Sequence, residues 1–81
     1  MVEAYILIQV TNGTSHRVAS QLAELAEVIT AHPIMGPYDV ITFVRVEDAD
    51  AMGHLITDHM HTIAGVSRTL TCTVVPSTAD R

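Results

Sequence analysis

The sequence predicts a single α+β domain in which an antiparallel sheet carries two helices on one face. Four segments with runs or alternations of apolar and β-branched residues are typical of strands. Two segments with apolar residues every three or four positions are typical of helices, and they follow the first and the third strand. The predicted order is therefore β-α-β-β-α-β, and 81 residues suffice for only one domain.

The first strand and the first helix come from the amino-terminal third of the chain. Tyr5–Val10, YILIQV, is apolar on both alternating faces, which is typical of a strand covered on both sides. The turn sequence TNGTS follows, in which Asn12-Gly13 adopts positive φ easily and Thr14 or Ser15 can cap a helix. The apolar stripe of that helix is Val18, Ala19, Leu22, Leu25 and Ala26.

The second and third strands are predicted to form a hairpin. Glu27–Met35, EVITAHPIM, contains Pro33, which cannot donate a hydrogen bond to a neighbouring strand. We therefore expect this strand at an edge of the sheet. The turn GPYD, Gly36–Asp39, returns the chain into Val40–Val46, an apolar run that we expect at the centre of the sheet.

The second helix has clear signals at both ends. Asp48 or Asp50 is expected to cap its first turn, and Gly65 stands where a helix ends in a left-handed residue. Its periodicity predicts that six residues face the core. They are Met52, Leu55, Ile56, His59, Met60 and Ile63.

The last predicted strand, Val66–Val75, alternates between two kinds of side chain. We expect one set to face the core, with Cys72 as a small buried residue. We expect the other set on the sheet face that the helices leave uncovered. The first set is Leu70, Cys72 and Val74, and the second is Thr69, Thr71 and Thr73.

Two right-handed crossovers joined by a hairpin give the ferredoxin-like βαββαβ arrangement. The domain is expected over residues 1–76, followed by a polar tail, 77–81. A domain of this size buries only about 60% of its unfolded surface. Yet 48% of the residues are apolar and 16% are charged. We therefore expect a two-fold homodimer in which the uncovered sheet faces pack together as a sandwich.

Charge and cysteine content exclude several classes of function. The net charge is −5, and the four arginines are scattered, without a single lysine, so direct binding to nucleic acid is not expected. The lone Cys72 excludes an internal disulfide and fits a reducing compartment. The amino terminus does not resemble a signal peptide, and no apolar run is long enough to span a membrane. We expect a cytoplasmic protein.

Two short motifs carry a family resemblance. Gly36-x-Tyr38-Asp39 opens the third strand, and Gly65-Val66 enters a threonine-rich last strand. With this element order, the chain resembles the ligand-binding domain of the Lrp/AsnC family of transcriptional regulators, also called the RAM domain, over roughly residues 2–76. The resemblance implies that such domains dimerise, assemble into octamers or related rings, and bind amino acids or similar effectors near contacts between dimers.

Full-length members of the family also carry an amino-terminal helix-turn-helix. This sequence starts directly at the first strand, so it resembles the stand-alone members of the family. The resemblance therefore implies an effector-sensing domain that modulates its own assembly or a full-length regulator as its partner.

Asp39 is the principal candidate for binding such an effector. An aspartate at the start of a strand can accept a charge-assisted hydrogen bond from an α-ammonium group, and Gly36 lets backbone amides approach a carboxylate. The resemblance maps the whole site to Gly36, Tyr38, Asp39, Thr69 and Thr71. The alternative is structural: Gly36 makes a hairpin turn, Asp39 binds a backbone amide, Tyr38 packs and the threonines form cross-strand pairs.

Catalytic and metal sites have weaker support. His54, Asp58 and His61 are spaced to share one side of the second helix, but they would need a further ligand, so we expect no metal and no cofactor. The leading hypothesis is a non-enzymatic effector-binding domain. One rival is a small enzyme of the dimeric αβ-barrel type, a monooxygenase or isomerase, with His32 or His59 in a pocket inside each subunit. Another is an assembly domain without a ligand.

Overall fold

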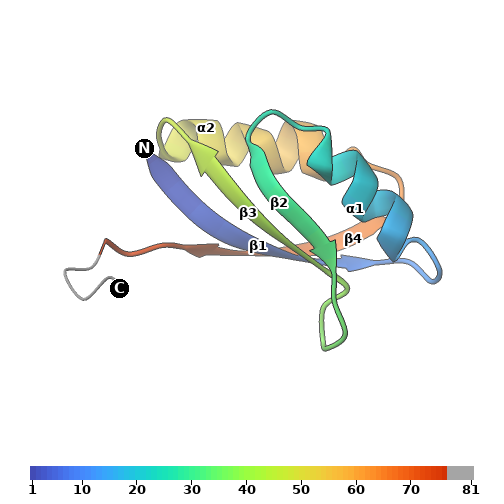
Figure 1. Ribbon diagram of the computed structural model, residues 1–81. Helices are drawn as coiled ribbons and strands as arrows, with labels where there is room; N and C mark the ends of the chain where they lie inside the picture. The colour runs from blue at the N-terminus through green and yellow to red at the C-terminus, as the bar shows by residue number, and fades with distance from the viewer. Residues whose placement is uncertain (77–81) are drawn as a thin grey trace.

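The computed structural model describes residues 1–76 and confirms the predicted element order (Figure 1). The predicted tail, 77–81, lies outside the described residues. Within them, no helix is long and apolar enough to cross a membrane. The elements are β1 (Val2–Val10), α1 (Ser15–Ala23), β2 (Val28–Pro33), β3 (Val40–Val46), α2 (Ala49–His54), the π-helix η1 (Leu55–Met60) and β4 (Val66–Thr73).

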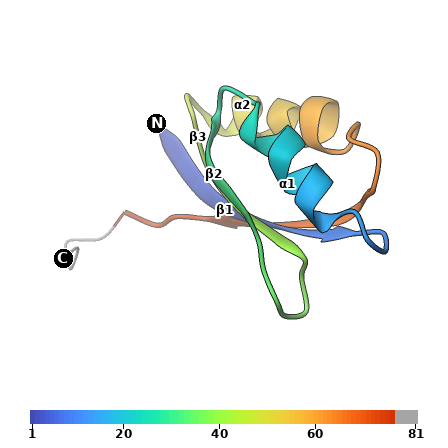
Figure 2. The same cartoon turned by 45° about the vertical axis from the view of Figure 1, so that its right-hand side comes forward.

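The sheet has the ferredoxin-like strand order β2-β3-β1-β4, and each neighbouring pair is antiparallel. β3 is central and β2 is an edge strand, as the sequence predicted from the run 40–46 and from Pro33, the last residue of β2. Both helical segments cover the same face of the sheet, and the described residues, 1–76, leave the other face open (Figures 1 and 2).

The core lies between the sheet and the helices. Alternate residues of β1, namely Ala4, Ile6 and Ile8, have no exposed surface. The one buried polar side chain among the described residues is Thr42, whose hydroxyl donates a hydrogen bond of 3.0 Å to the carbonyl of Ile6. The remaining buried residues are Val18, Ala19, Leu22, Val28, Val40, Val44, Val46, Met52, Leu55 and Met60.

The two helices begin differently. Asp48 caps α2 as predicted, because its carboxylate accepts a 2.8 Å hydrogen bond from the backbone N–H of Ala51. Thr14 precedes α1 but makes no such bond to the helix; its hydroxyl donates instead to the carbonyl of Thr11. α1 also ends earlier than its stripe predicted, so Ala26 lies exposed in a turn.

Gly65 has the positive φ predicted for it, 102°. It does not end the helix as predicted, because η1 ends at Met60 and His61 after it is still right-handed, so Gly65 lies in the loop before β4. A Cβ atom at this position would lie 2.8 Å from Nη2 of Arg17, which reaches across from α1. The positive φ requires a glycine here, and a Cβ would also lie 3.0 Å from Oγ1 of Thr14 and 3.2 Å from Cγ2 of Val18 on the α1 side.

The second helix does not stay α-helical. From Leu55 it continues as a π-helix, in which the N–H of His61 donates to the carbonyl of Ile56, five residues earlier, at 2.9 Å. The wider turn places Met60 in the core after Leu55 and leaves His59 exposed. The prediction that His59 faces the core is therefore wrong, because it assumed 3.6 residues per turn throughout.

The two faces of β4 are the reverse of those predicted. Residues directly opposite one another in an antiparallel pair share a face. Thr69 and Thr71 pair with the buried Ile8 and Ile6, so the threonines lie on the helix side. Cys72 pairs with Tyr5 and is exposed, so it is not a core residue. The row of β4 that includes Cys72 lies on the open face.

Candidate functional site

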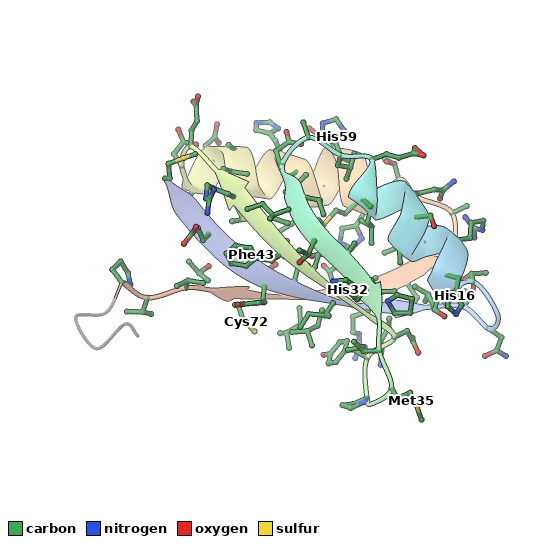
Figure 3. All side chains as sticks on the ribbon, viewed as in Figure 1. His16, His32, Met35, Phe43, His59 and Cys72 are labelled. Carbon is green, nitrogen blue, oxygen red and sulfur yellow. The ribbon has the colours of Figure 1, made fainter. Side chains whose placement is uncertain are left out.

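The hairpin between β2 and β3 carries three of the predicted site residues. It is closed by a hydrogen bond from the N–H of Ile34 to the carbonyl of Asp39, 2.9 Å long. The loop projects from the sheet on the side away from the helices (Figures 1 and 2). Met35 at its tip is fully exposed, and a Cβ added to Gly36 would have no atom within 4 Å (Figure 3). There is open space beside Gly36.

The two carboxylate oxygens of Asp39 differ in their hydrogen bonding: among the described residues one has a partner and the other has none. Oδ2 accepts a 2.9 Å hydrogen bond from the backbone N–H of Val10 at the end of β1, and the Asp39 N–H donates to Ile8. Oδ1 has no hydrogen-bond partner within residues 1–76, and no side-chain oxygen there is both buried and unpaired. The structural alternative is thus correct for one oxygen, whereas the other is accessible and unpaired among the described residues. Tyr38, which precedes Asp39, is half-buried.

The threonines of β4 form a separate part of the predicted site. Thr69 is half-buried and Thr71 exposed, both on the helix side. β1 lies between β3 and β4, with Ile8 paired to Val40 on one side and to Thr69 on the other. Two strand spacings, about 9.5 Å, therefore separate Thr69 from Val40, the neighbour of Asp39. One chain does not bring the two halves of the site together.

His61 is a polar contact of the site that sequence reasoning missed. Its Nε2 lies 3.1 Å from Oγ1 of Thr69, linking the end of η1 to β4. Helical spacing grouped His61 with His54 and Asp58, because the π-helix could not be anticipated. One signal was available: Gly65 turns the chain into β4, so residues shortly before it should lie near the start of that strand.

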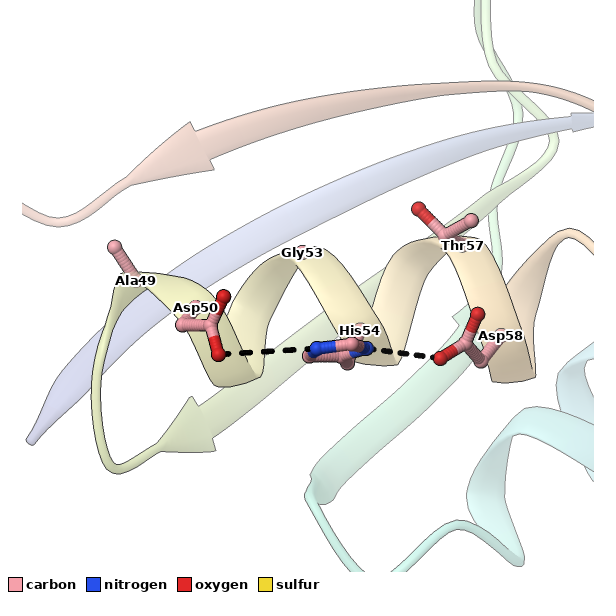
Figure 4. Close-up of a pocket in the computed structure, with 6 residues that line it drawn as sticks. All are labelled: Ala49, Asp50, Gly53, His54, Thr57 and Asp58. Carbon is pink, nitrogen blue, oxygen red and sulfur yellow. Dashed lines mark hydrogen bonds and ion pairs between the residues drawn. The ribbon is translucent and has the colours of Figure 1, made fainter.

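An acidic cluster holds His54 on the outer side of α2 (Figure 4). Its Nδ1 lies 2.9 Å from Oδ2 of Asp58, and its Nε2 lies 3.7 Å from Oδ2 of Asp50. The hydrogen bond with Asp58, then the negative charges of Asp50 and Asp58, raise the pKa of His54 above its ordinary value. Both ring nitrogens face carboxylates, and His61 is directed to Thr69 instead.

The candidate metal ligands and the candidate catalytic histidines are not gathered into one site within residues 1–76. Within the described part of the chain, no group of three or more His, Cys, Asp or Glu residues is arranged to hold a metal ion. His32 and His59, the candidates for an enzyme, are both exposed (Figure 3). One surface hollow is lined by Ala49, Asp50, Gly53, His54, Thr57 and Asp58. Another is lined by Met1, Glu27, Arg45, Val46, Glu47 and Ala51.

The open face of the sheet is an apolar surface with a charged end. We define it by the paired residues of β1, β3 and β4: Tyr5, Leu7, Ile41, Phe43, Leu70 and Cys72. The rings of Tyr5 and Phe43 lie 4.9 Å apart, and Leu70 keeps 44% of its surface exposed. At one end, Arg45 and Glu3 form an ion pair of 2.7 Å. Such a continuous apolar surface is typical of an interface.

Comparison with known proteins identifies the family of this chain. The family model described as the Lrp/AsnC ligand binding domain matches residues 3–81. An uncharacterised helix-turn-helix-type transcriptional regulator of Pyrococcus abyssi is 34% identical over 71 residues, covering 84% of this chain and 47% of the regulator. The fold and these matches define a ligand-binding domain of transcriptional regulators. The chain belongs to the Lrp/AsnC family.

Solved structures show the same fold. TTHA0845 from Thermus thermophilus superposes with a TM-score of 0.91 at 26% identity, covering 99% of this chain and 100% of that one. AsnC of E. coli gives 0.90 at 25% identity, covering 99% of this chain and 54% of AsnC. The NMB0573/L-Met complex from Neisseria meningitidis gives 0.85 at 17% identity, covering 98% and 53%, and shows the fold alone. The chain spans about half the length of the curated relatives it matches.

Proposed function

We propose that this protein is a non-enzymatic effector sensor that binds an amino acid or a similar small metabolite between subunits. Binding would alter its own oligomeric assembly or a partner transcriptional regulator. The observation that carries the proposal is Asp39, which is fixed through Oδ2 by the N–H of Val10 and leaves Oδ1 accessible and unpaired within residues 1–76. The same hairpin has open space at Gly36. A fixed carboxylate is a ready acceptor for an ammonium group.

The distance between the halves of the site supports binding between subunits. The ammonium and carboxylate of one α-amino acid are separated by two bonds, whereas about 9.5 Å separates the Asp39 end of β3 from Thr69. The hairpin also projects away from the helices, while the threonines lie on the helix side. We therefore assign Gly36, Tyr38 and Asp39 to one copy of the chain, and Thr69 and Thr71 to another.

The open face supplies the means of assembly. We infer that two copies pack through Tyr5, Leu7, Phe43 and their neighbours to form a two-fold dimer, because no part of the described chain covers this apolar surface. Contacts between such dimers would create the effector site and a higher oligomer. An effector that binds one assembly more tightly shifts the equilibrium toward it, which couples ligand to oligomeric state.

The relatives support regulation as the context. The Pyrococcus abyssi protein is named a transcriptional regulator, and the Neisseria structure is a complex with L-Met. We propose an effector of this class here, a cytoplasmic location, and a full-length Lrp/AsnC-type regulator as partner. We expect no direct contact with nucleic acid from these residues, because their net charge is −5 and they contain no lysine.

The rival functions have less support. His32 and His59 lie on the surface and not in a pocket between sheet and helices, where an enzyme of this fold would need its acid or base. An assembly domain without a ligand predicts a hairpin that is packed shut. Nothing within residues 1–76 of one chain closes it, since Met35 and Gly36 are exposed.

Calorimetric titration of the protein with each of the 20 standard amino acids tests the proposal. We expect one amino acid or one related group to bind. Asp39→Asn should weaken that binding by about 10- to 100-fold, because it removes a charge-assisted hydrogen bond worth about 1.5–3 kcal/mol. The Asn side chain keeps an oxygen for the N–H of Val10, so the hairpin and the dimer should remain intact.

Asp39→Ala is the matched variant, because it removes both the charge and the bond to Val10. Binding that survives in Asp39→Asn but is lost in Asp39→Ala would show that Asp39 acts only by fixing the hairpin. Unchanged binding in both variants would remove Asp39 from the site. No heat with any amino acid would contradict the proposed effector class.

A further inference from the structure

The contact between His61 and Thr69 joins the end of η1 to β4, the next strand in the chain. Nε2 of His61 lies 3.1 Å from Oγ1 of Thr69. The imidazole is exposed, whereas Thr69 is half-buried and stands in the row of β4 that also holds Thr71. Thr69 is therefore held by its neighbour at the rim of the helix-covered face, and its hydroxyl has bonding capacity left.

The π-helix positions this histidine. A π-turn is a rare and less favourable geometry than the α-helix, and it occurs frequently at functional sites. Here it turns Met60 into the core and lets the backbone N–H of His61 bond to Ile56. His61, the residue that follows the π-turn, is the one that contacts β4. The irregular backbone therefore positions His61 for its hydrogen bond with Thr69.

The direction of this hydrogen bond decides what Thr69 can bind. A threonine hydroxyl has one hydrogen to donate and two lone pairs. If Nε2 of His61 accepts, that hydrogen is consumed, and Thr69 can offer an effector only lone pairs. If Nε2 carries a proton and donates, Thr69 keeps its hydrogen for an anionic acceptor. The histidine thus sets Thr69 as an acceptor or as a donor toward the effector.

We propose that His61 is a positioning residue that donates from Nε2 to Thr69 and thereby presents the Thr69 hydroxyl to the carboxylate of the effector. The inference rests on the proposed function, in which Asp39 of another copy takes the ammonium group. It narrows the ligand to metabolites that carry a carboxylate beside an ammonium group, and it assigns His61 a part in selecting them over uncharged amides.

Two measurements test the inference separately. Long-range ¹H–¹⁵N spectra of the imidazole, recorded at alkaline pH where the ring is neutral, distinguish a protonated from an unprotonated Nε2. We expect protonation at Nε2 in the wild type. An unprotonated Nε2 would overturn the inference whether or not an effector is known.

Titration with each of the 20 amino acids and with its carboxamide gives the second measurement. For the amino acid that binds, we expect His61→Leu to weaken binding about three- to tenfold, the value of one hydrogen bond, and to reduce the preference for acid over amide. His61→Gln, whose amide can donate to Thr69, should restore both. His59→Leu, at an exposed histidine two residues earlier, should change neither.

The outcomes distinguish the two levels of the proposal. Binding of an amino acid with the same acid-to-amide preference in His61→Leu and wild type would overturn the role of His61 and leave the effector function standing. Absence of binding by every amino acid would contradict the effector function and the carboxylate assignment with it, while the ring spectrum would still decide the direction of the hydrogen bond.

Discussion

The two faces of the sheet differ although they are built from the same strands. Ile6 is completely buried beneath the helices, whereas Leu7, the next residue of β1, is only half-buried on the open face, and Tyr5 keeps 47% of its surface exposed. One face is completed by the chain itself. The other face is also apolar but has no cover within residues 1–76, so we expect stability to depend on the first face and assembly on the second.

A charge on the open face should have the largest effect. We expect Leu7→Asp to convert the dimer into a folded monomer, because two-fold symmetry would bury two unpaired carboxylates, each costing several kcal/mol. Light scattering would measure the mass, and circular dichroism the fold. Ser20→Asp adds the same charge to an exposed site on α1 and should leave the dimer unchanged. A Leu7→Asp protein with dimer mass would refute the assignment of the interface.

Removal of a core side chain should come next. Ile6→Ala should lower the free energy of unfolding by about 2–5 kcal/mol, through lost burial and the cavity left behind. Urea unfolding at several protein concentrations would measure it. The cost of Leu7→Ala should instead shrink on dilution, because its cover comes from a partner. Equal concentration dependence in both variants would remove the distinction between the faces.

The cap of α2 should have a smaller effect. Asp48→Ala should cost about 1 kcal/mol, because it leaves the N–H of Ala51 unpaired at the start of a helix that covers the core. Asp48→Asn keeps an acceptor and should cost much less. Urea unfolding at one fixed protein concentration suffices for this comparison, and an equal loss in both variants would mean that the hydrogen bond is not the cause.

Changes to the exposed ion pairs of His54, on the solvent side of α2, should have the smallest effect on stability. The folded pKa of His54 is raised, so its ion pairs with Asp58 and Asp50 stabilise the protein fully below the unfolded pKa of about 6.5. This contribution is lost as pH rises through the folded pKa. A titration by NMR should show a lower pKa for His54 in Asp58→Asn than in the wild type. An unchanged pKa would mean that the pair does not form in solution.

Local signals in the sequence were sufficient for most of the fold. Pro33 indicated the edge strand, Asp48 the start of α2, and Gly65 a turn with positive φ, because each depends on one residue's own chemistry. The helix itself ends earlier than Gly65 suggested, at Met60 of η1. The faces of β4 were predicted wrongly. Threonine alternates there with Leu70 and Cys72 on a largely exposed edge strand, so neither set is marked by burial, and pairing with β1 decides the register.

The site was predictable only in part for a similar reason. Asp39 stands out because an acid begins an apolar strand, and the structure hydrogen-bonds it to the backbone N–H of Val10 at the end of β1. His61 could not be linked to Thr69, since that contact depends on a π-turn which helical periodicity does not reveal. Whether Thr69 and Asp39 act on one ligand depends on a second copy of the chain.

Size-exclusion chromatography coupled to light scattering, with and without each common amino acid, tests the central claim most directly. The account predicts a dimer or a multiple of it in every condition, and a shift in mass or in melting temperature with one amino acid or one related group. A fixed oligomer that is indifferent to all of them would contradict effector sensing and would favour an assembly domain.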